Sequence, residues 1–211
     1  MSLIFACTAF QNITAQETSK EKSTDAKFGF KGGVNFSNFY KNEVDDQNVL
    51  TGINLGVFAK LPITENFAIQ PEVYFTTKGS ESVYNNAFVN GTAKFNLNYV
   101  EVPVLLVVNV VKNFNIHAGP YVAFLVDGKV SNESASGNFD FENNIDTDDY
   151  NKIDAGIAAG IAVDIESISI GARYNYGLTN IGKEKNYGGT NYTFPDAKNS
   201  VLSFYVSLAL N

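Results

Sequence analysis

The stretch FGFKGGVNFSNFY, residues 28–40, decides the fold, because apolar side chains alternate in it with small and polar ones. The apolar parity comprises Phe28, Phe30, Val34 and Phe36. The other parity carries glycine, asparagine, serine and a single lysine. Successive side chains in a β-strand point to opposite faces, so this alternation predicts a strand. What must be decided is which of the two faces is the inside.

The composition restricts the class of protein before any motif is considered. Charged residues make up 18% of the 211 residues and the formal net charge is −7, whereas soluble domains carry roughly 25% charged residues. The negative charge argues against a nucleic-acid partner. Cys7 is the only cysteine, which excludes a disulfide framework and a thiolate metal site. No stretch reaches the roughly 20 apolar residues of a membrane-spanning helix, so a chain that crosses a membrane does so here as a barrel.

The first residues are typical of an export signal with a shortened start, because no Lys or Arg precedes its apolar stretch. The apolar stretch Leu3–Phe10 is followed by small residues that suit a signal peptidase. We therefore interpret residues 1–16 as a signal peptide and residues 27–211 as the folded domain. Residues 17–26 are polar and lack an apolar period, which predicts a flexible periplasmic tail.

From Lys27 onward, strand patterns recur and their connections alternate in length. Eight segments show the strand pattern: 27–37, 51–61, 67–78, 94–109, 114–127, 151–165, 168–178 and 200–210. Long polar connections are expected at 38–50, 79–93, 128–150 and 179–199, and short ones at 62–66, 110–113 and 166–167. Outer-membrane barrels have short periplasmic turns and longer extracellular loops. The pattern predicts an all-β protein, an eight-stranded antiparallel up-and-down transmembrane β-barrel of the bacterial outer membrane, with periplasmic termini and extracellular long loops.

The apolar parity is then expected to face lipid and the other parity the lumen. The interior of an eight-stranded barrel is just wide enough for side chains to fill, and the second parity supplies mostly small and polar residues. Five charged residues take the inward parity: Lys31, Lys60, Glu72, Glu101 and Arg173. We expect them to form an ion network, in which Arg173 pairs with Glu72 or Glu101 and Lys31 neutralises the remaining carboxylate.

Two features interrupt the regular pattern. Residues 100–110 are apolar on both parities, which predicts a register shift or a bulge in the fourth strand. Pro71, Pro103 and Pro120 fall within three successive strands, in the half nearer the short turns. Because proline has no N–H to give to the ladder, we expect a local ladder defect there.

Four stretches carry a resemblance to a known family. They are GFKGGVNFSN (29–38), QPEVYFTTKG (70–79), NYVEVPVLL (98–106) and AGPYVAFL (118–125). They are similar to recurring elements of the PorT-like outer-membrane β-barrel family, over about residues 27–211. The resemblance implies a small Gram-negative barrel, and the name-giving member of the family belongs to a protein-secretion system. We expect a monomer whose partners are outer-membrane lipid and lipopolysaccharide. The terminal Asn211 departs from the aromatic residue that ends many such barrels.

The sequence does not indicate a catalytic or metal site. His117, the single histidine, has inward parity near the short-turn rim, which favours a structural role. Glu72 and Glu101 could form a general acid–base pair, but their inward parity beside cations favours ion pairs. The acidic loop 127–150 lacks the spacing of a calcium loop, and NYGGTNY (186–192) lacks the strand-to-helix setting of a phosphate loop. We expect no catalytic residue, no cofactor and no metal.

The expected function is non-enzymatic. We expect an outer-membrane barrel that displays four surface loops, for envelope integrity, adhesion or association with a secretion or envelope machine. A narrow channel and a soluble lipocalin-like ligand carrier are the alternatives. A lipid-modifying enzyme is disfavoured, because the one histidine lies far from the outer leaflet.

Overall fold

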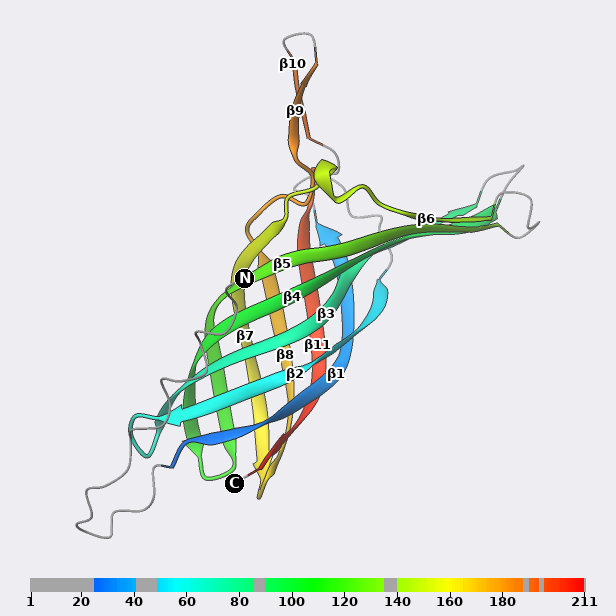
Figure 1. Cartoon of the computed structure of the whole chain (residues 1–211). Coiled ribbons are helices and arrows are strands. Elements are labelled where there is room, and N and C mark those ends of the chain that lie inside the picture. The colour runs from blue at the N-terminus through cyan, green and yellow to red at the C-terminus, as the bar shows by residue number, and fades with distance from the viewer. Residues whose placement is uncertain are drawn as a thin grey trace, which may run out of the picture.

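The computed structural model describes residues 25–40, 49–85, 90–134, 140–187, 190–193 and 196–210 (Figure 1). The expected signal peptide, most of the expected tail and Asn211 lie outside this part of the chain. Within it, no helix is long and apolar enough to cross a membrane.

Eight strands form a closed antiparallel ring. They are β1 (Lys27–Tyr40), β2 (Leu50–Pro62), β3 (Phe67–Asn85), β4 (Asn90–Val111), β5 (Phe114–Ser134), β7 (Ile153–Ile165), β8 (Ile168–Gly177) and β11 (Lys198–Ala209). Each of the eight pairs with the next one along the chain, and β1 pairs with β11 to close the ring. This arrangement confirms the eight-stranded antiparallel barrel that the alternating pattern predicts.

The strands β3, β4 and β5 run further than predicted on the side of the long connections. Their outer ends pair with one another beyond the ring, and β5 also pairs with the short strand β6 (Phe141–Asn144). We call the part formed by residues 79–85, 90–97, 128–134 and β6 the sheet extension; in Figure 1 it projects from one side of the barrel. The expectation of loops at 79–93 and 128–150 is thus partly wrong. Polar residues on both faces hide the strand period there, whereas backbone pairing continues from the ring.

Two smaller elements complete the described part of the chain. The strands β9 (Glu184–Tyr187) and β10 (Thr190–Thr193) pair only with each other as a hairpin, within the connection expected at 179–199. A single 3₁₀ turn, η1 (Thr147–Asp149), follows β6, and the Asp146 carboxylate caps it by accepting from the Asp148 amide at 3.0 Å.

The outer face of the ring is apolar and its interior is polar. Leu55 is 64% exposed and Phe204 48% exposed, whereas Asn35 is 0% and Glu72 2% exposed. This distribution is the reverse of a water-soluble domain, in which large apolar side chains are buried and unpaired polar ones are not. The apolar parity faces outward, as the sequence predicts.

The apolar outer face ends at a polar row across β3, β4 and β5. The Thr77 hydroxyl donates to Asn98 Oδ1 at 2.8 Å, and Asn98 Nδ2 donates to Asp127 Oδ1 at 2.5 Å. Past this row, the outer face of the sheet extension carries cross-strand ion pairs, Lys94–Glu133 at 3.7 Å and Lys129–Glu142 at 2.7 Å. The row therefore separates a surface suited to hydrocarbon from one suited to water.

The ladder irregularities predicted from the sequence are present. The β4–β5 register shifts between Asn98 and Tyr99 and again between Asn109 and Val111, at the two ends of the passage that is apolar on both parities. Three ladders join β2 to β3, β3 to β4 and β4 to β5. Each of them lacks two adjacent residue pairs, and one of the two missing pairs contains a proline: Pro71, Pro103 or Pro120. The missing N–H of proline explains the position of these gaps.

The two sides of the polar row can be compared with two valines of similar exposure. Val57 on the apolar belt is 48% exposed and Val83 on the sheet extension is 55% exposed. We expect Val57→Arg to lower the free energy of unfolding in lipid vesicles by about 2–4 kcal/mol, because the cation would lie in hydrocarbon, and Val83→Arg to lower it by about 0–1 kcal/mol. Urea titration of the refolded variants measures both losses. Equal losses would contradict the position of the row.

Candidate functional site

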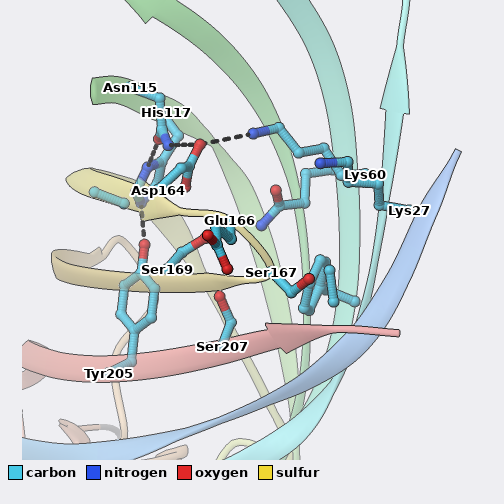
Figure 2. A pocket seen from close by; sticks show the side chains of 14 residues that line it. Lys27, Lys60, Asn115, His117, Asp164, Glu166, Ser167, Ser169, Tyr205 and Ser207 are labelled. Atoms are coloured by element: carbon cyan, nitrogen blue, oxygen red, sulfur yellow. Dashed lines mark hydrogen bonds and ion pairs between the residues drawn. The ribbon is translucent and has the colours of Figure 1, made fainter. Parts of the chain in front are cut away.

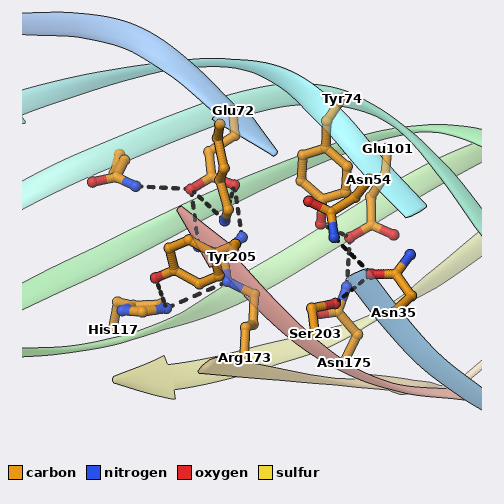
Figure 3. Close-up of polar contacts among 12 residues, drawn as sticks. Asn35, Asn54, Glu72, Tyr74, Glu101, His117, Arg173, Asn175, Ser203 and Tyr205 are labelled. Atoms are coloured by element: carbon orange, nitrogen blue, oxygen red, sulfur yellow. Dashed lines mark hydrogen bonds and ion pairs between the residues drawn. The ribbon is translucent and has the colours of Figure 1, made fainter. Parts of the chain in front are cut away.

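Two clusters of charged side chains fill the lumen of the barrel. Figure 3 shows Glu72 and Arg173 of one cluster and Glu101 of the other. The lower cluster, nearer the short turns, comprises Lys31 of β1, Glu72 of β3 and Arg173 of β8. The upper cluster, nearer the sheet extension, comprises Lys78 of β3, Glu101 of β4 and Asp154 of β7. All six side chains are buried. Charges in such a narrow interior must be paired, because little water can solvate them.

Glu72 binds both cations of the lower cluster. Arg173 Nη1 lies 2.6 Å from Glu72 Oε2 and Nη2 lies 2.9 Å from Oε1, which is the bidentate geometry of a guanidinium on a carboxylate. Lys31 Nζ approaches Glu72 Oε2 at 3.0 Å, and Gln70 Nε2 donates to Oε1 at 2.8 Å. The lower cluster thus holds two cations on one carboxylate.

The small residues of the inward parity make room for these long side chains. The ring of Tyr205 lies over both cations, with its centroid 3.8 Å from Lys31 Nζ and 5.3 Å from Arg173 Cζ. A Cβ added at Gly171 would lie 2.5 Å from the Tyr205 hydroxyl oxygen, so a larger residue would displace the ring. Glycine on the polar parity is therefore a packing requirement of the lumen.

The upper cluster holds one cation and two carboxylates, the reverse of the lower cluster. Lys78 Nζ lies 2.6 Å from Glu101 Oε2 and 2.8 Å from Asp154 Oδ2. The Tyr74 hydroxyl donates a hydrogen bond to Glu101, and Asn175 Nδ2 donates one to the same carboxylate at 2.5 Å. One cation therefore serves two carboxylates. With ordinary ionisation the lower cluster carries an excess of one positive charge and the upper cluster an excess of one negative charge, so that the two together are neutral.

A further ion pair and a small cavity lie at the short-turn rim (Figure 2). Lys60 Nζ is 3.3 Å from Asp164 Oδ2, and both side chains are partly exposed. The cavity has a volume of about 50 Å³, and its lining includes His117, Lys60 and Asp164. Buried apolar side chains, among them Phe39 and Leu97, form a packed cluster toward the other end.

The structure brings together some of the five expected network residues and separates others. Lys31, Glu72 and Arg173 meet in the lower cluster. Glu101 lies with Lys78 rather than with either lower cation, and Lys60 lies with Asp164 at the rim. Lys31 shares Glu72 with Arg173 instead of neutralising a second carboxylate, because Lys78 already pairs with Glu101.

The expected five-residue network lacks three charges that the structure places with it: Lys78, Asp154 and, at the rim, Asp164. Lys78 and Asp154 have inward parity within the expected strands 67–78 and 151–165, which could have indicated their place in the lumen. Both residues stand, however, at strand ends that were expected to border loops. Among the residues described, no group of three or more His, Cys, Asp or Glu side chains is placed to hold a metal ion. The geometry as a whole fills and closes the lumen.

The sharing of Glu72 predicts unequal losses of stability within the lower cluster. Glu72→Gln leaves two buried cations without a carboxylate and should lower the free energy of unfolding by about 3–5 kcal/mol. Arg173→Met leaves the Lys31–Glu72 pair intact and should cost less, about 1–3 kcal/mol. In urea titrations, the loss of the double variant should be smaller than the sum of the single losses. Equal single losses, or additive ones, would show that Glu72 is not shared.

Comparison with known proteins gives the following matches. Residues 14–183 match a family model described as an outer membrane protein β-barrel domain. No curated protein matches the chain. Among solved structures, the chain is similar to Neisserial surface protein A, NspA, at 13% identity and a TM-score of 0.51, over 87% of this chain and 98% of that one. Ail, the attachment invasion locus protein of Yersinia pestis, is 11% identical with a TM-score of 0.49, over 88% and 99% of the two chains. At such identities, the similarity to NspA concerns the fold alone.

Proposed function

We propose a function for this chain on one premise: it belongs to the outer membrane protein β-barrel domain family. In that setting the apolar belt faces outer-membrane lipid, and the chain is a bacterial outer-membrane β-barrel. We propose that it is a non-enzymatic, monomeric display scaffold, in which a sealed barrel in contact with lipid and lipopolysaccharide presents the sheet extension and the other long connections outside the cell. The presented surface would serve envelope integrity, adhesion or association with a larger envelope machine. The resemblance to PorT-like barrels favours the last of these.

One observation carries this proposal, namely the contrast between the filled lumen and the projecting sheet. Side chains that are at most 2% exposed occupy the lumen, among them Lys78, Tyr99, Glu72 and Glu101. Such an interior is poorly suited to a channel or to a ligand carrier. The sheet extension, by contrast, is formed by the outer ends of three long strands, which build a surface outside the barrel. His117 lies in the lumen at the short-turn end, which is an unsuitable position for chemistry on outer-leaflet lipid.

The decisive experiment removes the sheet extension and keeps the barrel. Joining Gly79 to Asn96, which are paired on β3 and β4, by an Asn-Gly turn deletes most of two of its strands and keeps Lys78 of the upper cluster. We expect the shortened protein to refold in vesicles with the lumen clusters intact. It should fail to recover the partners that the full chain yields after cross-linking of cells and co-purification. Recovery of the same partners by both proteins would contradict display by the sheet extension, and conductance of the full chain in planar bilayers would favour a channel.

Orientation gives a second prediction, tested with single cysteines. Glu142 on β6 and Thr64 in the short turn between β2 and β3 are both exposed, at opposite ends of the barrel. In intact cells, a membrane-impermeant maleimide should label Glu142→Cys and leave Thr64→Cys unlabelled, because short turns of such barrels face the periplasm. Cells with a permeabilised outer membrane should label at both positions. The unsubstituted chain controls for Cys7, and the reverse pattern in intact cells would invert the orientation.

A further inference from the structure

His117 contacts the lower cluster through one ring nitrogen and the rim through the other (Figures 2 and 3). Arg173 Nε donates to His117 Nε2 at 3.3 Å, and the Tyr205 hydroxyl lies 3.3 Å from the same nitrogen. On the other side of the ring, Nδ1 lies 3.2 Å from Asn115 Oδ1. The histidine therefore links the buried guanidinium to the residues of the short-turn end.

These contacts specify the protonation state of the ring. Asn115 Nδ2 donates to Asp164 Oδ2 at 3.1 Å, which fixes the amide so that its oxygen faces His117 Nδ1. That oxygen can only accept, so Nδ1 carries the proton. The Nε–H of Arg173 can only donate, so Nε2 must offer its lone pair. Both neighbours thus require a neutral imidazole with its proton on Nδ1.

A second proton on the ring would bind in an unfavourable environment. It would sit on Nε2, remove the acceptor for Arg173 and place a cation against the guanidinium. The charges of Lys31 and Lys60 also act on the ring, against the carboxylate of Glu72. The other neighbours offer little compensation, because Asp164 of β7 is paired with Lys60, and Val107 is the residue of β4 that pairs with His117.

The ring has no room to move toward β7, and protons can reach it from the rim. A Cβ added at Gly160 of β7 would lie 2.6 Å from His117 Nε2, so the backbone of β7 confines the ring on that side. The cavity of about 50 Å³ beside the ring extends to Ser167 in the short turn between β7 and β8. A water molecule needs roughly 10–15 Å³ of such space, so the cavity can hold several waters that lead from the rim to the ring.

We propose that His117 is an acid-sensitive latch on the lower cluster. Neutral His117 accepts from Arg173 and holds the guanidinium against Glu72. In mild acid, with protons entering from the short-turn end, His117 can take up a proton only where that hydrogen bond is broken and Arg173 has moved away, so acid favours a loosened lower lumen over the latched one. This property goes beyond the display function and does not depend on it.

The test compares the wild-type protein with His117→Gln, which cannot take up a proton. Unfolded chain binds the proton at the ordinary histidine pKa, about 6.5, while the latched barrel does not, so stability is lost as the pH falls through that value. Between pH 7.5 and 5.0 the wild-type unfolding constant in vesicles should rise by up to about 30-fold more than that of His117→Gln. Because His117 is the only histidine, the difference between the two isolates its proton. The same rise in both proteins would overturn the latch.

Two further measurements keep the proposal testable if His117→Gln does not refold. Tyr205→Phe removes the hydroxyl from Nε2 and keeps an aromatic ring beside Arg173, and it should keep most of the wild-type pH dependence. Nitrogen-15 spectra of the wild-type ring at pH 7 should show the neutral tautomer protonated on Nδ1. A charged ring at that pH, a proton on Nε2, or a pH dependence abolished by Tyr205→Phe would each overturn the latch.

Discussion

The closure of the ring by β1 and β11 is the constraint on which the rest of this molecule depends. Closure satisfies every edge by pairing, so the outer surface can be apolar over its whole circumference. It also fixes a narrow interior into which eight strands project half of their side chains. Each inward charge must therefore meet a partner across the lumen, as Glu72 meets Arg173, and small residues such as Gly171 leave space for the long side chains.

The charges of the lumen satisfy this constraint unevenly. A one-to-one set of ion pairs would have been simpler, but the lower cluster shares one carboxylate between two cations and the upper cluster shares Lys78 between two carboxylates. Sharing makes each central residue more important than its partners. It also couples strands that are far apart in the ring, because Lys78 of β3 binds Asp154 of β7.

The sequence predicts the ring better than it predicts what lies inside and above it. Period-two alternation and alternating connection lengths are local signals, and they are enough for the eight strands, their facing and the proline gaps. The partner of a lumen charge depends on strand tilt and on reach across the barrel, which parity does not contain. Glu101 shows this limit, because its inward facing was readable but its pairing with Lys78 was not. The sheet extension escaped prediction for another reason. Adjacent residues of β3 there, such as Ser80 and Glu81, are polar on both faces, which hides the period of a strand.

The proline gaps have a mechanical consequence for the wall of the barrel. Pro71, Pro103 and Pro120 interrupt three consecutive ladders, so the omitted pairs lie side by side from β2 to β5. Elsewhere, adjacent strands are joined continuously and resist sliding. Along this arc the wall has fewer crosslinks per unit length, and it can bend or shear at a lower energetic cost than the opposite side. The barrel is therefore a cylinder with one compliant side, and that side lies beneath the sheet extension that β3, β4 and β5 carry outward.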